Sequence, residues 1–436
     1  MAIATPNASN TSTSATVPGT GQNYGAPLAT VTTLFFMWGF LTCLNDILVP
    51  HLKPIFDLNY TKVMLIQFAF FGAYFIFSIP SAKIVDWIGY QRSMVVGLLV
   101  MGLGAFLFVP AASVPSYPLF LGALIVLAAG ITCLQVAANP YVTVLGKPET
   151  ASSRLNLTQA FNSLGTFLAP FFGGLFILTA ARNIEEVRAL APDALQAYRL
   201  HEAATVKLPY VGLGIALVLL AIAIGSFKLP KIPHAQHQLG EKVNDSIWKH
   251  PNLILGAIGI FVYVGAEVSI GSFLVNYFSQ PEIGGLTEKV AASFVAFYWG
   301  GAMVGRFIGS ALLQKIKTGG LLAICAVCAA GLVAVSMLTN GHTAMYSIIL
   351  VGFFNSIMFP SIFTLGVAEL GPLTGDGSGI MIMAIVGGAI IPVAQGWIAD
   401  RIGIHHAFFL PVICYLYILY FALSGSRPNS ERYAKV

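Results

Sequence analysis

The stretch APLATVTTLFFMWGFLTCLNDILVP, residues 26–50, is the first long apolar run of the chain and decides how the rest is interpreted. About 20 predominantly apolar residues suffice to span a bilayer as a helix. Only helices and closed barrels satisfy their own backbone groups in lipid, and uninterrupted runs favour helices. We expect twelve spans, near residues 28–50, 62–83, 92–112, 117–142, 153–180, 208–227, 253–278, 290–313, 320–338, 343–368, 377–398 and 406–424.

The composition excludes an ordinary water-soluble protein. Of the 436 residues, 57% are hydrophobic and only 9% are charged, and the mean hydropathy is +0.81. Soluble domains carry about 25% charged residues. The net charge of +5 is small, so we expect no nucleic-acid partner. We find no phosphate-binding Gly-x-x-x-x-Gly-Lys-Ser/Thr loop and no His-Glu-x-x-His or Gly-x-Ser-x-Gly motif, so we expect neither an enzyme nor a cofactor.

The expected spans divide the chain into two halves of equal size. Residues 1–25 are polar, lack Lys and Arg, and are expected to form a disordered cytoplasmic tail. Residues 26–227 hold a first six-helix bundle and residues 251–425 a second. A basic cytoplasmic linker, residues 228–250, joins them, and residues 426–436 form a cytoplasmic tail.

The distribution of Lys and Arg predicts the orientation. With the N-terminus inside, 14 Lys and Arg fall in inside segments and 8 in outside segments. Cytoplasmic loops carry the excess of these residues, so both termini are expected in the cytoplasm. We expect a multi-pass protein of the plasma membrane, in bacteria the inner membrane. The segment Arg182–Lys207 is expected to form a short surface helix outside.

A short motif hints at internal symmetry. Asp86-Trp87-Ile88-Gly89 follows the second span, and Asp400-Arg401-Ile402-Gly403 follows the eleventh. Both have the pattern Asp-x-x-Gly after the second helix of a three-helix unit, one inside and one outside. Inverted three-helix repeats predict such an arrangement.

Asp46 is the residue of the first span that costs the most free energy to place inside a membrane. A carboxylate at membrane depth costs about 2.5–3.5 kcal/mol on insertion scales, so its usual roles are to bind a cation, relay a proton or hold a polar substrate. Trp38, Thr42 and Asn45 share its helical face. A structural pair between helices is the alternative for Asp46. Trp38 would either stack on a sugar ring or pack as an ordinary aromatic residue.

Two pairs of amides lie in the fourth and fifth spans. Gln135 and Asn139 share one helical face, as do Gln159 and Asn162. Hydrogen bonds between helices are the simple explanation for single amides. Two pairs beside Asp46 favour a polyol-binding surface, because each amide offers donors and acceptors together.

The second half contains a further intramembrane acid. Glu267 lies near the middle of the seventh span, the counterpart of the first, with Tyr263 one turn before it. Glu267 is therefore a candidate for the coupling cation or for the substrate. Further substrate-binding candidates are Tyr263, Asn276, Arg306 and Asn355, although Arg306 could instead reach the membrane interface.

Four stretches carry a family resemblance: Leu44–Pro50, Gln135–Gly146, Arg154–Gly165 and Phe359–Gly366. With them the chain resembles the major facilitator superfamily, specifically the fucose:proton symporter family and its glucose/galactose transporter branch. The resemblance implies an all-α membrane protein with twelve transmembrane helices in two six-helix bundles around a central cavity.

The resemblance also assigns roles. The carboxylate that handles the coupling proton corresponds to Asp46, and Asn162 and Arg306 match the residue types of the family. The fucose transporter has a glutamate where this chain has Gln135, which implies a sugar other than fucose. Coupling would then rest on Asp46 alone or recruit Glu267.

We therefore expect a monomeric hexose:cation symporter, with glucose or galactose as the substrate and the lipid bilayer around it. The cation is H⁺ or Na⁺, and Asp46, Asn45 and Thr42 would supply oxygen ligands to Na⁺. The alternatives are a fucose or other deoxy-sugar proton symporter, a sugar sensor with little flux, and an exporter of drugs or lipids on the same fold.

Overall fold

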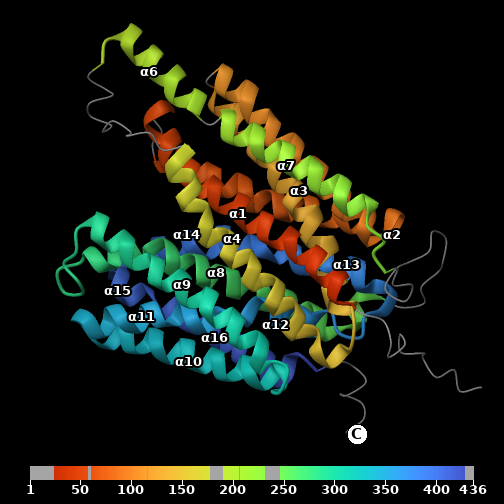
Figure 1. Cartoon of the computed structure of the whole chain (residues 1–436). Coiled ribbons are helices and arrows are strands. Elements are labelled where there is room, and N and C mark those ends of the chain that lie inside the picture. The colour runs from red at the N-terminus through yellow and green to blue at the C-terminus, as the bar shows by residue number, and fades with distance from the viewer. Residues whose placement is uncertain are drawn as a thin grey trace, which may run out of the picture.

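The computed structural model describes residues 24–56, 60–114, 116–176, 190–205, 207–230 and 246–427, and within them every regular element is a helix (Figure 1). The first half comprises α1 (Gly25–Phe56), α2 (Tyr60–Ser113), α3 (Tyr117–Val144), α4 (Ala151–Phe176), α6 (Pro192–Thr205) and α7 (Lys207–Ser226). The second half comprises α8 (Pro251–Ser279), α9 (Glu288–Leu312), α10 (Thr318–Leu338), α11 (Gly341–Asn355), α12 (Met358–Gly366), α13 (Thr374–Met383), α14 (Gly387–Ile402), α15 (Ile404–Ala407) and α16 (Phe409–Tyr420).

The lengths of the apolar helices agree with the twelve expected spans. In the described ranges, nine segments are long and apolar enough to cross a membrane, and one of them, Phe68–Ser113, has 46 residues. Such a helix would be about 70 Å long, against about 30 Å of hydrocarbon, so it contains two spans. Helices α1 and α4 account for the first and fifth spans.

The two spans within α2 meet at Gly89, where the backbone leaves the helical region with φ 80° and ψ 168°. Gly403, between α14 and α15, has nearly the same conformation, with φ 84° and ψ 154°. Positive φ of this kind favours glycine, which has no Cβ. The two Asp-x-x-Gly motifs thus end in the same backbone turn, which supports the internal symmetry predicted from them.

The two halves form two helix bundles, the first in the upper part of Figure 1 and the second in the lower part. Helix α2 packs against α13, and α4 packs against α9. In the first of these contacts, Lys83 Nζ lies 2.8 Å from Asp376 Oδ1. In the second, the hydroxyl of Ser153 donates to the carbonyl of Ser310 at 2.7 Å.

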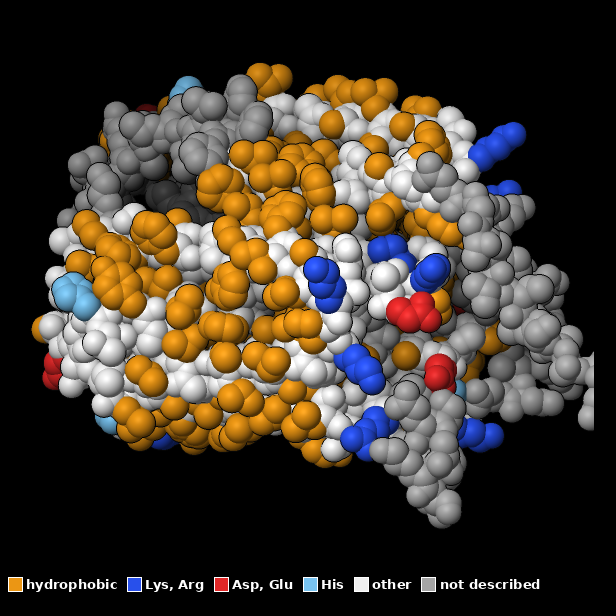
Figure 2. Space-filling model, turned by 60° about the horizontal axis from the view of Figure 1, so that its bottom comes forward, with side chains coloured by type: hydrophobic (Ala, Val, Ile, Leu, Met, Phe, Trp, Pro, Cys, Tyr) orange, Lys and Arg blue, Asp and Glu red, His pale blue; other side chains and the backbone are white. Residues whose placement is uncertain are grey.

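Apolar side chains cover much of the molecular surface. Figure 2 shows them spread over the middle of one face, while most of the Lys and Arg visible there gather toward one side. Leu338, Ile222 and Trp397 are each more than half exposed. In water such a surface would associate, but in a bilayer it matches the surrounding lipid.

Helix α6 occupies part of the segment for which a short surface helix is predicted. Its first residues, Asp193, Ala194 and Pro192, are exposed. A helix in this segment is therefore confirmed, whereas its side of the membrane stays a prediction.

Candidate functional site

Two of the amides predicted in the fourth and fifth spans, Asn139 and Gln159, meet between α3 and α4. Nε2 of Gln159 donates to Oδ1 of Asn139 at 3.5 Å. Gln135, Asn139 and Gln159 are all buried, with exposed fractions of 2%, 0% and 5%. Among the described residues, Nδ2 of Asn139 has no hydrogen-bond partner although it is sealed from solvent. A buried donor without a partner is costly, and a ligand oxygen would relieve that cost.

Gln135 contacts a residue that sequence reasoning missed. Its Nε2 donates to the hydroxyl of Tyr74, on α2, at 2.8 Å. Tyr74 is only 3% exposed, and its ring packs edge-on against Phe70 at 5.5 Å between centroids. In the sequence Tyr74 is one aromatic residue among several in the second span, and only the presence of a hydroxyl distinguished it from its neighbours.

Trp38 and Asn162 lie where α1 and α4 approach most closely. A Cβ at Gly39 would collide with the backbone oxygen of Asn162, so the two helices pack backbone to backbone there. Nδ2 of Asn162 donates to the carbonyl of Phe35 at 2.9 Å. Trp38 is 7% exposed, and its ring lies 5.0 Å from that of Phe35. At least one donor of Asn162 therefore holds the helices together.

The predicted coupling-ion residues of the first span cannot be placed in the same way. The backbone of Thr42, Asn45 and Asp46 belongs to α1. Their side chains lie outside the described part of the chain. An H⁺ or Na⁺ site at Asp46 therefore stays a prediction.

In the second bundle, Glu267 lies in a cluster of hydroxyls and amides. The hydroxyl of Tyr263 contacts Oε1 of Glu267 at 2.8 Å and the carbonyl of Asn355 at 3.2 Å. Nδ2 of Asn355 donates to the hydroxyl of Tyr298 at 2.8 Å. The structure thus brings together three of the predicted residues, Tyr263, Glu267 and Asn355, and adds Tyr298 from α9.

Arg306 reaches from the second bundle to the first. Its Nη1 donates to the hydroxyl of Ser163 and contacts the carbonyl of Gln159 at 3.5 Å. Its Nε donates at 3.3 Å to the carbonyl of Ser356, at the break between α11 and α12. These contacts hold the side chain between the two bundles.

Asn276 lies apart from this cluster. It is near the end of α8 and is exposed. Among the described residues it makes no hydrogen bond to Tyr263, Glu267 or Asn355. Its predicted role in substrate binding therefore stays a prediction without a supporting contact.

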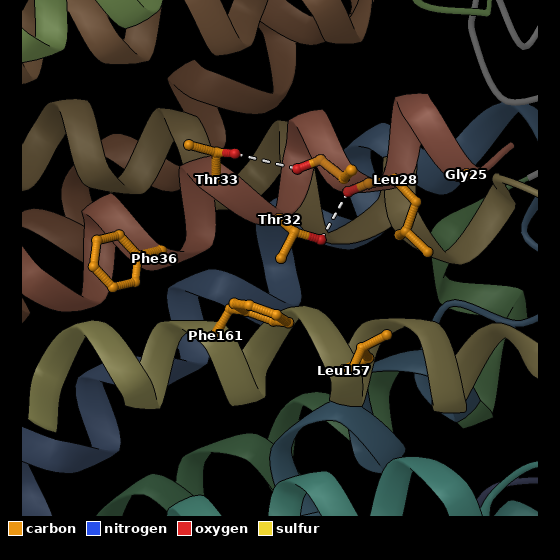
Figure 3. A pocket seen from close by; sticks show the side chains of 8 residues that line it. Gly25, Leu28, Thr32, Thr33, Phe36, Leu157 and Phe161 are labelled. Atoms are coloured by element: carbon orange, nitrogen blue, oxygen red, sulfur yellow. Dashed lines mark hydrogen bonds between the residues drawn. The ribbon is translucent and has the colours of Figure 1, made fainter.

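A hollow of about 420 Å³ between α1 and α4 is distinct from the amides (Figure 3). Leu28, Phe36, Leu157 and Phe161 contribute apolar walls. Thr32 also lines it, but its hydroxyl donates to the carbonyl of Leu28 at 2.7 Å within α1. Because the hydroxyl of Thr32 is already engaged, the hollow offers little to a polar ligand. We therefore place the candidate site at the amides.

Two facing helix bundles with buried amides and an intramembrane carboxylate define a multi-pass membrane protein with a polar centre. The model of the Major Facilitator Superfamily matches residues 28–385, and the chain belongs to this family. Its fold and the resemblance inferred from the sequence are thereby confirmed.

Three similar proteins carry names that point to sugar transport. The chain is 56% identical to the glucose/galactose transporter of Brucella abortus biovar 1 (strain 9-941), over 93% of this chain and 95% of that one. It is 46% identical to the putative glucose/galactose transporter of Helicobacter pylori (strain J99 / ATCC 700824), over 93% and 98%. It is 35% identical to the L-fucose-proton symporter of Escherichia coli (strain K12), over 93% and 94%.

Solved structures agree with the sequence relatives. A crystal structure of a Major Facilitator Superfamily transporter, FucP, in the outward conformation superposes with a TM-score of 0.85. The two chains are 33% identical, and the match covers 93% of this chain and 100% of the other.

Proposed function

We propose that this protein is a secondary active transporter that imports a hexose, glucose or galactose, together with a cation by alternating access. The observation that carries the proposal is the 56% identity, over nearly the full length, to a protein named a glucose/galactose transporter. The relative named an L-fucose-proton symporter is more distant, at 35%. Gln135, in place of the glutamate of the fucose transporter, agrees with this ranking.

The amides between α3 and α4 would form the sugar site. Gln135, Asn139 and Gln159 combine donors and acceptors, as the hydroxyls of a sugar require. Nδ2 of Asn139 supports this assignment, because it is a buried donor without a partner among the described residues. Trp38, on the neighbouring α1, would supply an apolar face for the ring. Asn162 contributes by positioning α1 against α4.

Asp46 would carry the coupling cation. A bare carboxylate is costly to enclose when the cavity closes, and a bound proton or Na⁺ removes that cost. The proton is favoured because two relatives, including that of Escherichia coli, are named L-fucose-proton symporters. Sodium is the alternative, with Asn45 and Thr42 as additional oxygen ligands. Glu267 is the second candidate for a titrating group.

The contacts between the bundles suggest which side is closed. The ion pair of Lys83 with Asp376 and the hydrogen bond of Ser153 with Ser310 lie at helix ends predicted to be cytoplasmic. With that orientation the structure is closed toward the cytoplasm, which agrees with its superposition on a transporter in the outward conformation. We place both termini in the cytoplasm and the protein, as a monomer, in the plasma membrane, the inner membrane of bacteria.

Uptake into proteoliposomes tests the proposal. Purified protein would be reconstituted and given labelled glucose, galactose or fucose, with an inward gradient of H⁺, of Na⁺, or of neither. We expect glucose or galactose to accumulate with the H⁺ gradient only. Accumulation with Na⁺ alone would identify the other cation, and accumulation of fucose alone would identify a deoxy-sugar symporter. Binding without any uptake would favour a sensor and contradict the proposal.

A further inference from the structure

The hydrogen bond between Gln135 and Tyr74 determines which end of the amide is left for a ligand. Nε2 of Gln135 donates to the hydroxyl oxygen of Tyr74 at 2.8 Å. The amide is planar and its two ends point in different directions, so a fixed Nε2 turns Oε1 away from Tyr74. Since the tyrosine oxygen accepts this bond, the hydroxyl proton of Tyr74 is available for donation.

We infer that Tyr74 is a specificity-determining residue of the sugar site, where it acts with Gln135 as a donor and acceptor for one sugar hydroxyl. The hydroxyl of Tyr74 donates to the sugar oxygen, and Oε1 of Gln135 accepts from the same sugar hydroxyl. A sugar hydroxyl can donate and accept at once, so it satisfies both groups. This inference rests on the proposed function, and it names a residue that the amide pattern alone does not reveal.

The surroundings of Tyr74 place the pair beside the junction of the two bundles. Tyr74 neighbours Phe71, at 6.5 Å between ring centroids. Phe71 in turn packs against Gly388 of the second bundle, where a Cβ would lie 2.8 Å from its ring. Ser378, on α13, donates to the carbonyl of Val136, the residue after Gln135, at 3.0 Å. Substrate sites of such transporters lie between the halves, near the middle of the membrane.

Burial makes the pair selective. Tyr74 and Gln135 are 3% and 2% exposed, so water satisfies neither group well once the site is closed. Sites that hydrogen-bond a substrate hydroxyl reject analogues without it, because their own polar groups are then left unpaired. A glutamate at position 135 would accept a hydrogen bond from the hydroxyl of Tyr74, and the pair would then offer only acceptors to the sugar. The amide therefore changes the hydrogen-bonding pattern that the site recognises.

Sugar analogues test the inference on the full-length protein in proteoliposomes. Inhibition of labelled galactose uptake would be measured with monodeoxy and monodeoxyfluoro galactose at each ring position, for the wild type and Tyr74→Phe. A fluorine accepts weakly and cannot donate, so the wild type should discriminate against both analogues at one position. In Tyr74→Phe, galactose should bind about two- to tenfold more weakly. Removal of the hydroxyl at that one position should then cost less affinity than in the wild type. The loss of affinity on removing any other hydroxyl, which we call the penalty at that position, should stay unchanged.

Tyr141→Phe is the matched control, because the hydroxyl of Tyr141, on α3, donates instead to the carbonyl of Pro230 at 3.2 Å. It should leave every penalty unchanged. If Tyr74→Phe does not fold, Gln135→Glu should alter the penalty at the same ring position. A uniform loss of affinity for all analogues, or no change, would overturn the role of Tyr74 but not the proposed function. A wild type that takes up no hexose would overturn both.

Discussion

Arg306, on α9 of the second bundle, donates a hydrogen bond to the hydroxyl of Ser163, on α4 of the first. The same guanidinium contacts the carbonyl of Gln159, one of the buried amides, at 3.5 Å. A charged side chain of one bundle is thus fixed against a helix of the other. The contacts that close the two bundles against each other, on the side predicted to be cytoplasmic, therefore involve groups that also surround the candidate site.

Ser163→Ala should weaken that closure. Hydrogen bonds to charged groups contribute about 1.5–3 kcal/mol, and 1.4 kcal/mol is a factor of ten in an equilibrium. A cysteine at Ser153, which is buried between α4 and α9, would report opening through its rate of maleimide labelling. The five natural cysteines would first be replaced. We expect labelling about tenfold faster in Ser163→Ala.

The control is Ser113→Ala, because the hydroxyl of Ser113 donates only within its own helix, to the carbonyl of Val109. This variant should label at the rate of the parent. Equal rates for Ser163→Ala and the parent would show that the contact of Arg306 does not hold the bundles together.

Asp46→Asn should separate binding from accumulation. An amide needs no cation to be enclosed, so the variant should exchange labelled sugar across the membrane without concentrating it. Counterflow and gradient-driven uptake would be measured on the same proteoliposomes. Asp193→Asn, in the exposed first turn of α6, is the control and should accumulate sugar normally. Full accumulation by Asp46→Asn would rule out the proposed coupling role.

Tyr263→Phe and Glu267→Gln should act through the same hydrogen bond. Tyr263 contacts Oε1 of Glu267 at 2.8 Å, so either change removes or weakens one interaction. Residues in one network give non-additive effects. We therefore expect the initial uptake rate of the double variant to resemble that of Glu267→Gln alone.

Tyr417→Phe provides the comparison, because its hydroxyl donates to the carbonyl of Leu255 outside this cluster. Combined with Glu267→Gln, it should give effects that multiply. If the effects of Tyr263→Phe and Glu267→Gln also multiplied, Tyr263 and Glu267 would act independently.

Gly39→Ala should destabilise the first bundle. A Cβ there would collide with the backbone of Asn162, so α1 and α4 must separate. Overpacking of this kind costs about 1–3 kcal/mol. Thermal unfolding in detergent, at one scan rate, should occur a few degrees lower. Gly72→Ala is the control, since its Cβ would meet nothing within 4 Å, and it should unfold at or slightly above the temperature of the parent.

The spans could be predicted from the sequence because run length and apolarity are local properties. The expected spans 117–142 and 320–338 correspond to α3 and α10 within two residues at each end. The form of the joins could not be predicted. The turn at Gly89 takes a single residue. The tenth span is interrupted between the end of α11 at Asn355 and the start of α12 at Met358, although hydropathy does not change there.

The arrangement of the residues in the candidate site could be predicted in part. Helical spacing placed Gln159 near Asn139, because residues on facing helices meet when each pair shares a face. Tyr74 and Tyr298 were missed, since an aromatic residue in a span is ordinarily apolar packing. Asn162 shows the converse difficulty. An amide that faces a helix carbonyl has the same spacing as one that faces a ligand, and only the tertiary contact with Phe35 distinguishes them.

The turn at Gly403 has a consequence for how the chain tolerates change. The residue is exposed, and a Cβ there would meet nothing within 4 Å. Its φ of 84° and ψ of 154° nevertheless disfavour every L-amino acid with a side chain, by roughly 1–3 kcal/mol. In a saturation-mutagenesis survey, this open surface position should therefore be as restrictive as a packed one. The cause would be the handedness of the backbone, and a D-alanine introduced there by chemical ligation should be accepted where L-alanine is not.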